Sequence, residues 1–124
     1  MTPQKGITTV MIVDDSEVAR ELLRDILEEC GYAVVGEAAD GVEAVGKYRT
    51  LRPLVTIMDV KMPIMGGIEA ARKILVQDSG AKILMCSSSD RESLLSAAAD
   101  AGACGFVAKP FTPEKVVEAV DAAI

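Results

Sequence analysis

The chain has 124 residues, of which 50% are hydrophobic, 26% are charged and 3% are aromatic, and its formal net charge is −6. This length suits one domain with an ordinary core, and the composition favours a globular chain over a disordered one. The negative charge argues against a nucleic-acid-binding surface, which needs a basic patch or stripe.

Two further features of the composition limit the chemistry and the compartment. The sequence contains no histidine, which excludes imidazole metal ligands, Ser-His and Cys-His nucleophile pairs, and phosphate carried on a histidine of this chain. Three widely spaced cysteines without a CxxC pair indicate reduced thiols. The start of the chain lacks the apolar core of a secretory signal, and the apolar runs are too short to span a bilayer. We therefore expect a cytoplasmic protein without membrane contact.

The first half of the chain alternates strand and helix. A strand at 9–13 is followed by a helix that Ser16 caps and Gly31 closes. A second strand at 33–37 leads to Asp40, which begins a helix that ends before Pro53. The apolar positions expected to face the core are Val18, Ala19, Leu22, Leu23, Ile26 and Leu27 in the first helix and Val42, Val45 and Tyr48 in the second, where Gly46 is unfavourable.

The second half continues the alternation. The third strand, 54–59, is followed by a loop at 60–66 and a helix that carries Ile68, Ala71, Ile74 and Leu75. A turn at 78–80 leads to the fourth strand, 82–87, and to a helix at 91–101, capped by Asp90 and stopped by Gly102. The fifth strand is 105–108, and Thr112-Pro113 opens the last helix, with Val116, Val117 and Val120 facing inward. Five such units predict an α/β fold, a doubly wound sandwich with a parallel sheet and helices on both faces.

Carboxylates lie at the carboxyl ends of two of the predicted strands. Asp14 and Asp15 follow the first strand, and Asp59 ends the third. Open α/β sheets place their ligands at the carboxyl ends of the strands, and a hard divalent cation takes oxygen ligands. Lys109 follows the fifth strand and supplies the opposite charge. Together with a hydroxyl such as Ser87, this set predicts a site that handles a phosphoryl group.

Short motifs stand at the strand ends in a characteristic order along the chain. They are Val13-Asp14-Asp15-Ser16, Met58-Asp59-Val60-Lys61-Met62-Pro63, Gly66-Gly67, Met85-Cys86-Ser87-Ser88, Ala101-Gly102-Ala103, Gly105-Phe106 and Lys109-Pro110-Phe111. With these motifs the chain resembles, over nearly its full length, the receiver domain of two-component response regulators, most closely the single-domain chemotaxis (CheY-like) type. The resemblance implies a receiver domain at 1–124 with the flavodoxin-like strand order 2-1-3-4-5.

The resemblance also implies the roles of individual residues. Asp59 takes a phosphoryl group from a phosphohistidine of a sensor histidine kinase. Lys109 and Ser87 stabilise that group, and Ser87 and Phe106 form the switch, which alters the face of the fourth helix, fifth strand and fifth helix. Lys61 and Ser89 stand at positions that tune the lifetime of the aspartyl phosphate. The ligands of Mg²⁺, for which Mn²⁺ is a substitute, are Asp14, Asp15, Asp59 and the backbone carbonyl of Lys61.

The expected partners are the kinase, a downstream effector such as the flagellar switch, and a phosphatase. We expect the chain to be a monomer or weak dimer and to bind neither nucleic acid nor membrane. Such a protein is not an enzyme beyond self-phosphorylation and slow self-dephosphorylation. The alternatives are a receiver excised from a longer regulator, a degenerate receiver that signals through contacts alone, a flavodoxin-like cofactor binder, and a phosphatase with an aspartyl nucleophile. Adjacent Asp14 and Asp15 fit neither the DxD pattern of that phosphatase class nor a phosphate-binding loop.

Overall fold

A computed structural model describes residues 8–88 and 92–124. Within these residues a single sheet of parallel strands alternates with helices, and the strand order is β2-β1-β3-β4-β5. The predicted fold class and strand order are confirmed. The elements in chain order are β1 (Thr9–Val13), α1 (Glu17–Glu29), β2 (Ala33–Ala38), α2 (Gly41–Leu51), β3 (Val55–Asp59), α3 (Gly67–Gln77), β4 (Lys82–Ser87), α4 (Glu92–Asp100), β5 (Gly105–Ala108) and α5 (Pro113–Ala123).

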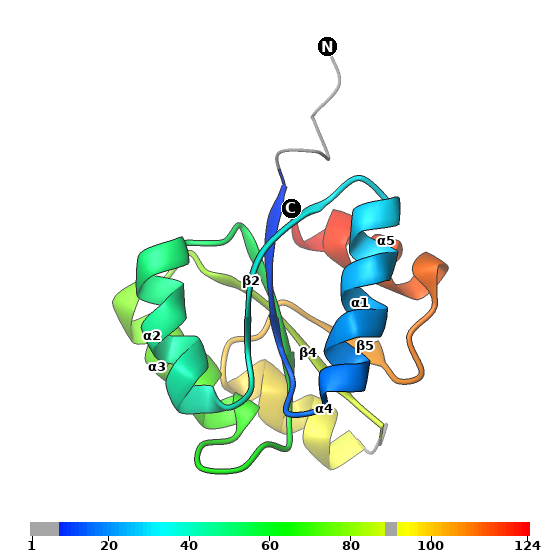
Figure 1. The fold of residues 1–124 in the computed structure, drawn as a ribbon. Coiled ribbons are helices and arrows are strands. Elements are labelled where there is room, and N and C mark those ends of the chain that lie inside the picture. The colour runs from blue at the N-terminus through cyan, green and yellow to red at the C-terminus, as the bar shows by residue number, and fades with distance from the viewer. Residues whose placement is uncertain (1–7, 89–91) are drawn as a thin grey trace.

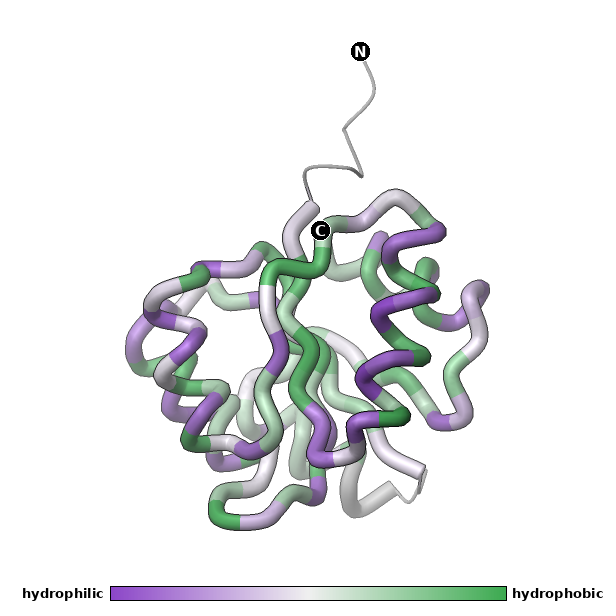
Figure 2. The backbone as a smooth tube through the Cα atoms, viewed as in Figure 1, coloured by the Kyte–Doolittle hydropathy of each residue, from purple (hydrophilic) through white to green (hydrophobic). Residues whose placement is uncertain are grey.

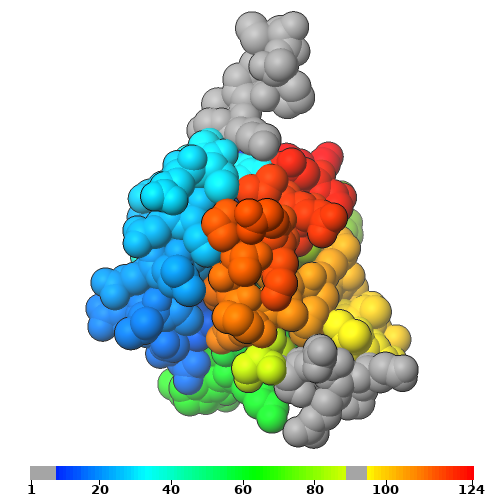
Figure 3. Space-filling model, turned by 90° about the vertical axis from the view of Figure 1, so that its right-hand side faces the viewer, coloured from blue at the N-terminus to red at the C-terminus, as the bar shows by residue number. Residues whose placement is uncertain are grey.

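The sheet lies between two layers of helices. Figure 1 shows α2 and α3 on one side of the sheet and α1 and α5 on the other. Figure 3 shows α1 beside α5 on the outer surface of the second layer. Each layer buries its own hydrophobic cluster: one includes Tyr48, Ile74 and Ala98 and the other includes Leu23, Ile26 and Val116. The strands at the centre are therefore apolar along most of their length, whereas the helices alternate apolar and polar positions (Figure 2).

The helix ends follow from local sequence. The side chains of Ser16, Asp40 and Thr112 accept hydrogen bonds from backbone N–H groups in the first turns of α1, α2 and α5, as predicted. Gly31 and Gly102 have φ angles of 92° and 100° and close α1 and α4 with backbone bonds of the Schellman type. The predicted cap Asp90 and the predicted first helical residue Arg91 lie outside the described residues.

Three predictions about which residues face the core are wrong. Val18 and Leu22 are 75% and 45% exposed, and Val42 is 52% exposed. In α1 the buried stripe runs along Leu23, Ile26 and Leu27, and Val18 and Leu22 lie beyond one edge of that stripe, on the flank of the helix that faces solvent. Apolar identity alone made the predicted stripe of α1 too wide.

Two predicted strand boundaries are also wrong by one residue, because β2 extends to Ala38 and β3 begins only at Val55. Leu54 is exposed and precedes β3, because its N–H group bonds to the Thr9 hydroxyl instead of joining the sheet. Helix α2 forms despite Gly46. No helix among the described residues is long and apolar enough to cross a membrane.

Candidate functional site

The carboxyl ends of four strands meet at one edge of the sheet. Strand register places Val13 beside Met58, Asp59 beside Cys86, and Ser87 beside Ala108. Asp14 and Lys109 are the first residues after β1 and β5, respectively. The structure therefore brings Asp14, Asp59, Ser87 and Lys109 to the same edge of the sheet, where the sequence placed them.

The Lys109 ammonium lies between two buried carboxylates. Its Nζ donates a hydrogen bond to Oδ2 of Asp14 at 2.8 Å and lies 3.6 Å from Oδ1 of Asp59. Asp14 is 3% exposed and Asp59 is 7% exposed. Burial lowers the pKa of Lys109, but the hydrogen bond to Asp14 and the charge of Asp59 outweigh it, so the net pKa is raised. Lys109 is therefore a fixed cation in an acidic pocket.

Asp14 is held at every polar atom. Its N–H group donates to the Ala38 carbonyl at 3.0 Å, and its Oδ1 accepts from the N–H group of Ser16 at 2.9 Å. Its own carbonyl accepts from Nη1 of Arg20 at 2.7 Å. With Oδ2 bonded to Lys109, the orientation of this carboxylate is set by β2, α1 and the β5–α5 loop together.

Asp59 is an electrostatically unfavourable carboxylate. Burial and the nearby charge of Asp14 raise its pKa to about 6, Lys109 opposes that rise, and Asp15 adds to it. One lysine thus does not compensate for the acidic groups. A hard divalent cation would supply the missing positive charge and would take carboxylate oxygens as ligands, so the pocket fits Mg²⁺.

Cys86 is a feature of the pocket that the sequence interpretation missed. Its Sγ and one carboxylate oxygen each of Asp14 and Asp59 lie within 4.8 Å of one another. Burial, and next the charge of Asp59, raise the pKa of this thiol, so it stays protonated and is a poor ligand for a hard ion. The parallel register, which pairs Cys86 with Asp59, is the signal that would have found it.

The remaining predicted site residues differ in burial and in their distance from the group formed by Asp14, Asp59 and Cys86. Asp15 is exposed and is not part of the group around Cys86, although its charge acts on Asp59. Lys61 is exposed in the loop after β3. Phe106 is half-buried and packs against the cluster on the α2 and α3 side of the sheet. Ser87 is buried, and its carbonyl accepts from the N–H group of Lys109 at 3.0 Å. Ser89 lies outside the described residues.

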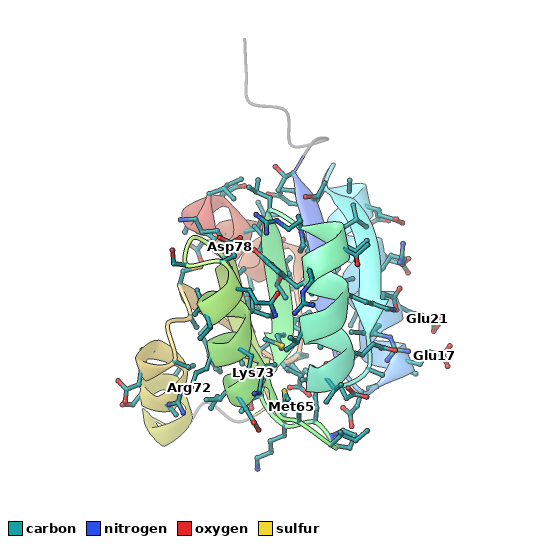
Figure 4. All side chains as sticks on the ribbon, turned by 90° about the vertical axis from the view of Figure 1, so that its left-hand side faces the viewer. Glu17, Glu21, Met65, Arg72, Lys73 and Asp78 are labelled. Atoms are coloured by element: carbon teal, nitrogen blue, oxygen red, sulfur yellow. The ribbon has the colours of Figure 1, made fainter. Side chains whose placement is uncertain are left out.

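Two loops border the pocket. The Lys109-Pro110 peptide bond is cis, and the Lys109 ammonium lies 5.9 Å from the centre of the Phe111 ring. In the β3–α3 loop, which carries Met65 in Figure 4, Ile64 adopts a φ of 70° and is 83% exposed. This conformation is unfavourable for a β-branched residue, so the loop next to Asp59 carries backbone strain.

A doubly wound sheet with paired acids and a lysine at its carboxyl edge defines a class of phosphoacceptor domains, and the comparisons with known proteins agree. The family model described as "Response regulator receiver domain" matches residues 10–121. The chain is 46% identical over 112 residues to the chemotaxis protein CheY of Thermotoga maritima, covering 90% of this chain and 93% of that protein. It is 46% identical over 111 residues to CheY of Halobacterium salinarum, covering 90% and 92%.

A solved structure is similar at the level of the fold and the sequence. The crystal structure of the CheX-CheY-BeF3-Mg²⁺ complex from Borrelia burgdorferi contains a chain that matches with a TM-score of 0.87 and 34% identity, covering 90% of this chain and 85% of that one. The chain belongs to the response regulator receiver family. It is a CheY-like phosphoacceptor, a signalling protein and not a classical enzyme, and its acidic pocket contains Asp14 and Asp59.

Proposed function

We propose that the protein accepts a phosphoryl group on Asp59 and passes the signal on as a change of its surface. The observation that carries the proposal is the Lys109 ammonium placed 2.8 Å from one buried carboxylate and 3.6 Å from another. A half-buried lysine at that place can pair with an incoming phosphoryl oxygen once a metal ion binds the carboxylates. Positioning and charge stabilisation are the main needs of phosphoryl transfer.

The residues proposed to hold Mg²⁺ are Asp14, Asp15, Asp59 and the backbone carbonyl of Lys61, and Mn²⁺ is proposed as a substitute. When bound, the ion would neutralise these acids and attract the oxygens of the transferring group. Support comes from the acidic pocket itself and from the solved Borrelia burgdorferi CheY complex, which includes Mg²⁺.

In the proposed reaction a carboxylate oxygen of Asp59 attacks the phosphorus atom of a phosphohistidine on a sensor histidine kinase. The new bond is an acyl phosphate, and the P–N bond breaks with its electron pair going to the departing imidazole. Lys109 pairs with the transferred group, and the Ser87 hydroxyl donates a hydrogen bond to it. Both residues lie at the ends of strands next to β3 or β4, which fixes their positions relative to Asp59.

The proposed output is a two-state change of the surface formed by α4, β5 and α5. Movement of Ser87 toward the phosphoryl group would let Phe106, now half-buried, turn inward. Lys61 and Ser89 are proposed to tune the lifetime of the phosphorylated state. A downstream effector reads the surface; the resemblance to CheY proteins makes a flagellar switch and a chemotaxis role the specific proposal.

The remaining parts of the proposal concern organisation and location. Residues 1–124 form one receiver domain that works in the cytoplasm as a monomer or weak dimer, without binding nucleic acid or membrane. A phosphatase is proposed to reset it; the CheY chain of the Borrelia burgdorferi structure is bound to CheX.

The test is intact-mass spectrometry after incubation with acetyl phosphate, in which acetate leaves instead of imidazole. We expect one phosphoryl adduct on the wild-type protein with Mg²⁺, and none after chelation of the metal. Asp59→Asn should remove the adduct, whereas Asp25→Asn, which changes an exposed carboxylate on α1, should keep it. An adduct of equal yield on Asp59→Asn would contradict the proposal.

A further inference from the structure

We propose that Arg20, on α1, is a positioning residue for the metal-binding loop, because it fixes the peptide group that joins Asp14 to Asp15. This inference rests on the proposed role of those two acids as metal ligands. Among the described residues, the side chain of Arg20 contacts Glu37 and the Asp14 carbonyl and makes no hydrogen bond or ion pair with Asp59.

The contacts of Arg20 form a rigid link between three segments. Its Nη1 donates to the Asp14 carbonyl at 2.7 Å, and its Nε donates to Oε1 of Glu37 on β2 at 2.8 Å. The second oxygen of Glu37 accepts a hydrogen bond from Nε of Arg24 at 2.8 Å and lies 2.7 Å from Nη2 of Arg24 as an ion pair. The side chain of Arg20 is 17% exposed and that of Glu37 28%. A planar guanidinium held at two of its nitrogens has a fixed orientation.

The local fold explains why Arg20 lies there. Ser16 caps α1, and the N–H group of Arg20 closes the first turn by donating to the Ser16 carbonyl at 3.0 Å. Glu37 is the register partner of Ile12 on β1, two residues before Asp14. The side chain of Arg20 therefore extends over the end of β1 toward β2.

The bonded atom determines what Arg20 controls. The Asp14 carbonyl belongs to the peptide group that leads into Asp15, so its orientation sets the direction in which Asp15 leaves the strand end. The Asp14 side chain has two other anchors, Ser16 and Lys109. The exposed Asp15 carboxylate has no recorded hydrogen bond among the described residues and depends on its backbone for placement. Loss of the Arg20 contact should thus displace Asp15 first.

The direction in which Mg²⁺ affinity changes on loss of Arg20 distinguishes a positioning role from a purely electrostatic one. Arg20 is a cation near a cation site, so its charge alone weakens Mg²⁺ binding, and its removal would strengthen binding if charge were its only influence. Positioning predicts the opposite. Arg24 is the matched control, because it binds the same Glu37 carboxylate but makes no recorded contact with Asp14.

The experiment is calorimetric titration of the metal-free protein with Mg²⁺ alone. In Arg20→Gln and in Arg20→Lys, which keeps the charge but not the planar fork, we expect the Kd for Mg²⁺ to rise about tenfold, the lower end of what losing a partner that orients a metal ligand costs. Arg24→Gln should stay within about twofold of the wild type, since it leaves the Asp14 carbonyl contact intact. Thermal unfolding checks that each variant is folded.

A second readout needs no metal. Hydrogen exchange at the N–H group of Ser16, which bonds to Asp14, should be faster in both Arg20 variants and unchanged in Arg24→Gln. If Arg20→Gln and Arg20→Lys bound Mg²⁺ as tightly as the wild type, or more tightly, the positioning role of Arg20 would be wrong while the proposed metal site would stand. A wild-type protein that binds no Mg²⁺, or an Asp15→Asn variant that binds it normally, would instead overturn the proposed metal site.

Discussion

Asp59 shows how the surroundings of a single residue prepare it for its role. Burial and the charge of Asp14 raise its pKa from 3.8 to about 6, so the unliganded pocket binds protons that the unfolded chain has already lost at the same pH. Between these two values the folded state holds more protons than the unfolded state, so the free energy of unfolding falls as the pH rises. Above the pKa of the folded state, Asp59 is ionised in both states, and the full unfavourable contribution of its buried charge to the stability of the fold is present.

Asp59→Asn should therefore stabilise the metal-free protein, and more so at higher pH. The gain should be near zero at a pH below the unfolded value and should grow to about 3 kcal/mol above the folded value. Urea unfolding in the presence of a chelator, measured from acid to neutral pH, tests this, with Asp25→Asn as the control. A gain that is the same at every pH would show that the charge of Asp59 is not the cause.

Thr56 offers a second prediction at the residue scale. It is fully buried in β3, and its Oγ1 has no hydrogen-bond partner among the described residues. By contrast, the hydroxyl of Thr9 accepts from the N–H group of Leu54 at 2.9 Å. Replacing a buried hydroxyl that makes no hydrogen bond by a methyl group removes a desolvation penalty.

Thr56→Val should raise the free energy of unfolding by about 1 kcal/mol, and Thr9→Val should lower it by a similar amount. Denaturant titrations of the two variants measure both changes. If Thr56→Val were destabilising while Thr9→Val behaved as expected, the Thr56 hydroxyl would have a partner in solution.

At the scale of elements, two glycines at helices have opposite roles. A Cβ at Gly46, in the middle of α2, would meet no atom within 4 Å. A Cβ at Gly67, the first residue of α3, would clash with the backbone carbonyl of Asp59 and lie 2.8 Å from Cε of Met85. Gly46 is thus a cost to helix stability, whereas Gly67 allows α3 to begin directly against the strand end that carries Asp59.

Gly46→Ala should stabilise the protein by about 0.5 to 1 kcal/mol, because alanine favours the helix and restricts the unfolded chain. Gly67→Ala should destabilise it by more than about 1 kcal/mol and should also weaken Mg²⁺ binding by displacing Asp59. Thermal unfolding and metal titration of the two variants check this pair. Equal effects of the two substitutions would mean that a methyl group at position 67 fits beside the backbone carbonyl of Asp59.

Helix ends were predictable because they depend on local chemistry, whereas exposed apolar residues were not. The caps at Ser16, Asp40 and Thr112 follow from short-range hydrogen bonds. The exposure of Val18 and Val42 depends on which helix row packs on the sheet, and apolar identity alone does not decide that.

At the scale of the whole molecule, topology explains why the site could be predicted from the sequence. Asp14, Asp59 and Lys109 each lie at or directly after the end of an apolar strand, and the strand order implied by the resemblance makes those ends neighbours. Cys86 lies in the pocket because the strand register pairs it with Asp59, and Arg20 reaches the Asp14 carbonyl through its long side chain. Neither contact leaves a simple spacing pattern in the sequence.

Asp59, among all the acids of this chain, is the residue proposed to form the covalent bond to phosphorus. Borohydride reduces an aspartyl phosphate to homoserine and releases phosphate, which marks the residue permanently. After phosphorylation with acetyl phosphate and Mg²⁺, reduction and tandem mass spectrometry, we predict homoserine at position 59 alone. Homoserine at another aspartate, or at none in a protein that carries the phosphoryl adduct, would show that Asp59 is not the phosphoacceptor.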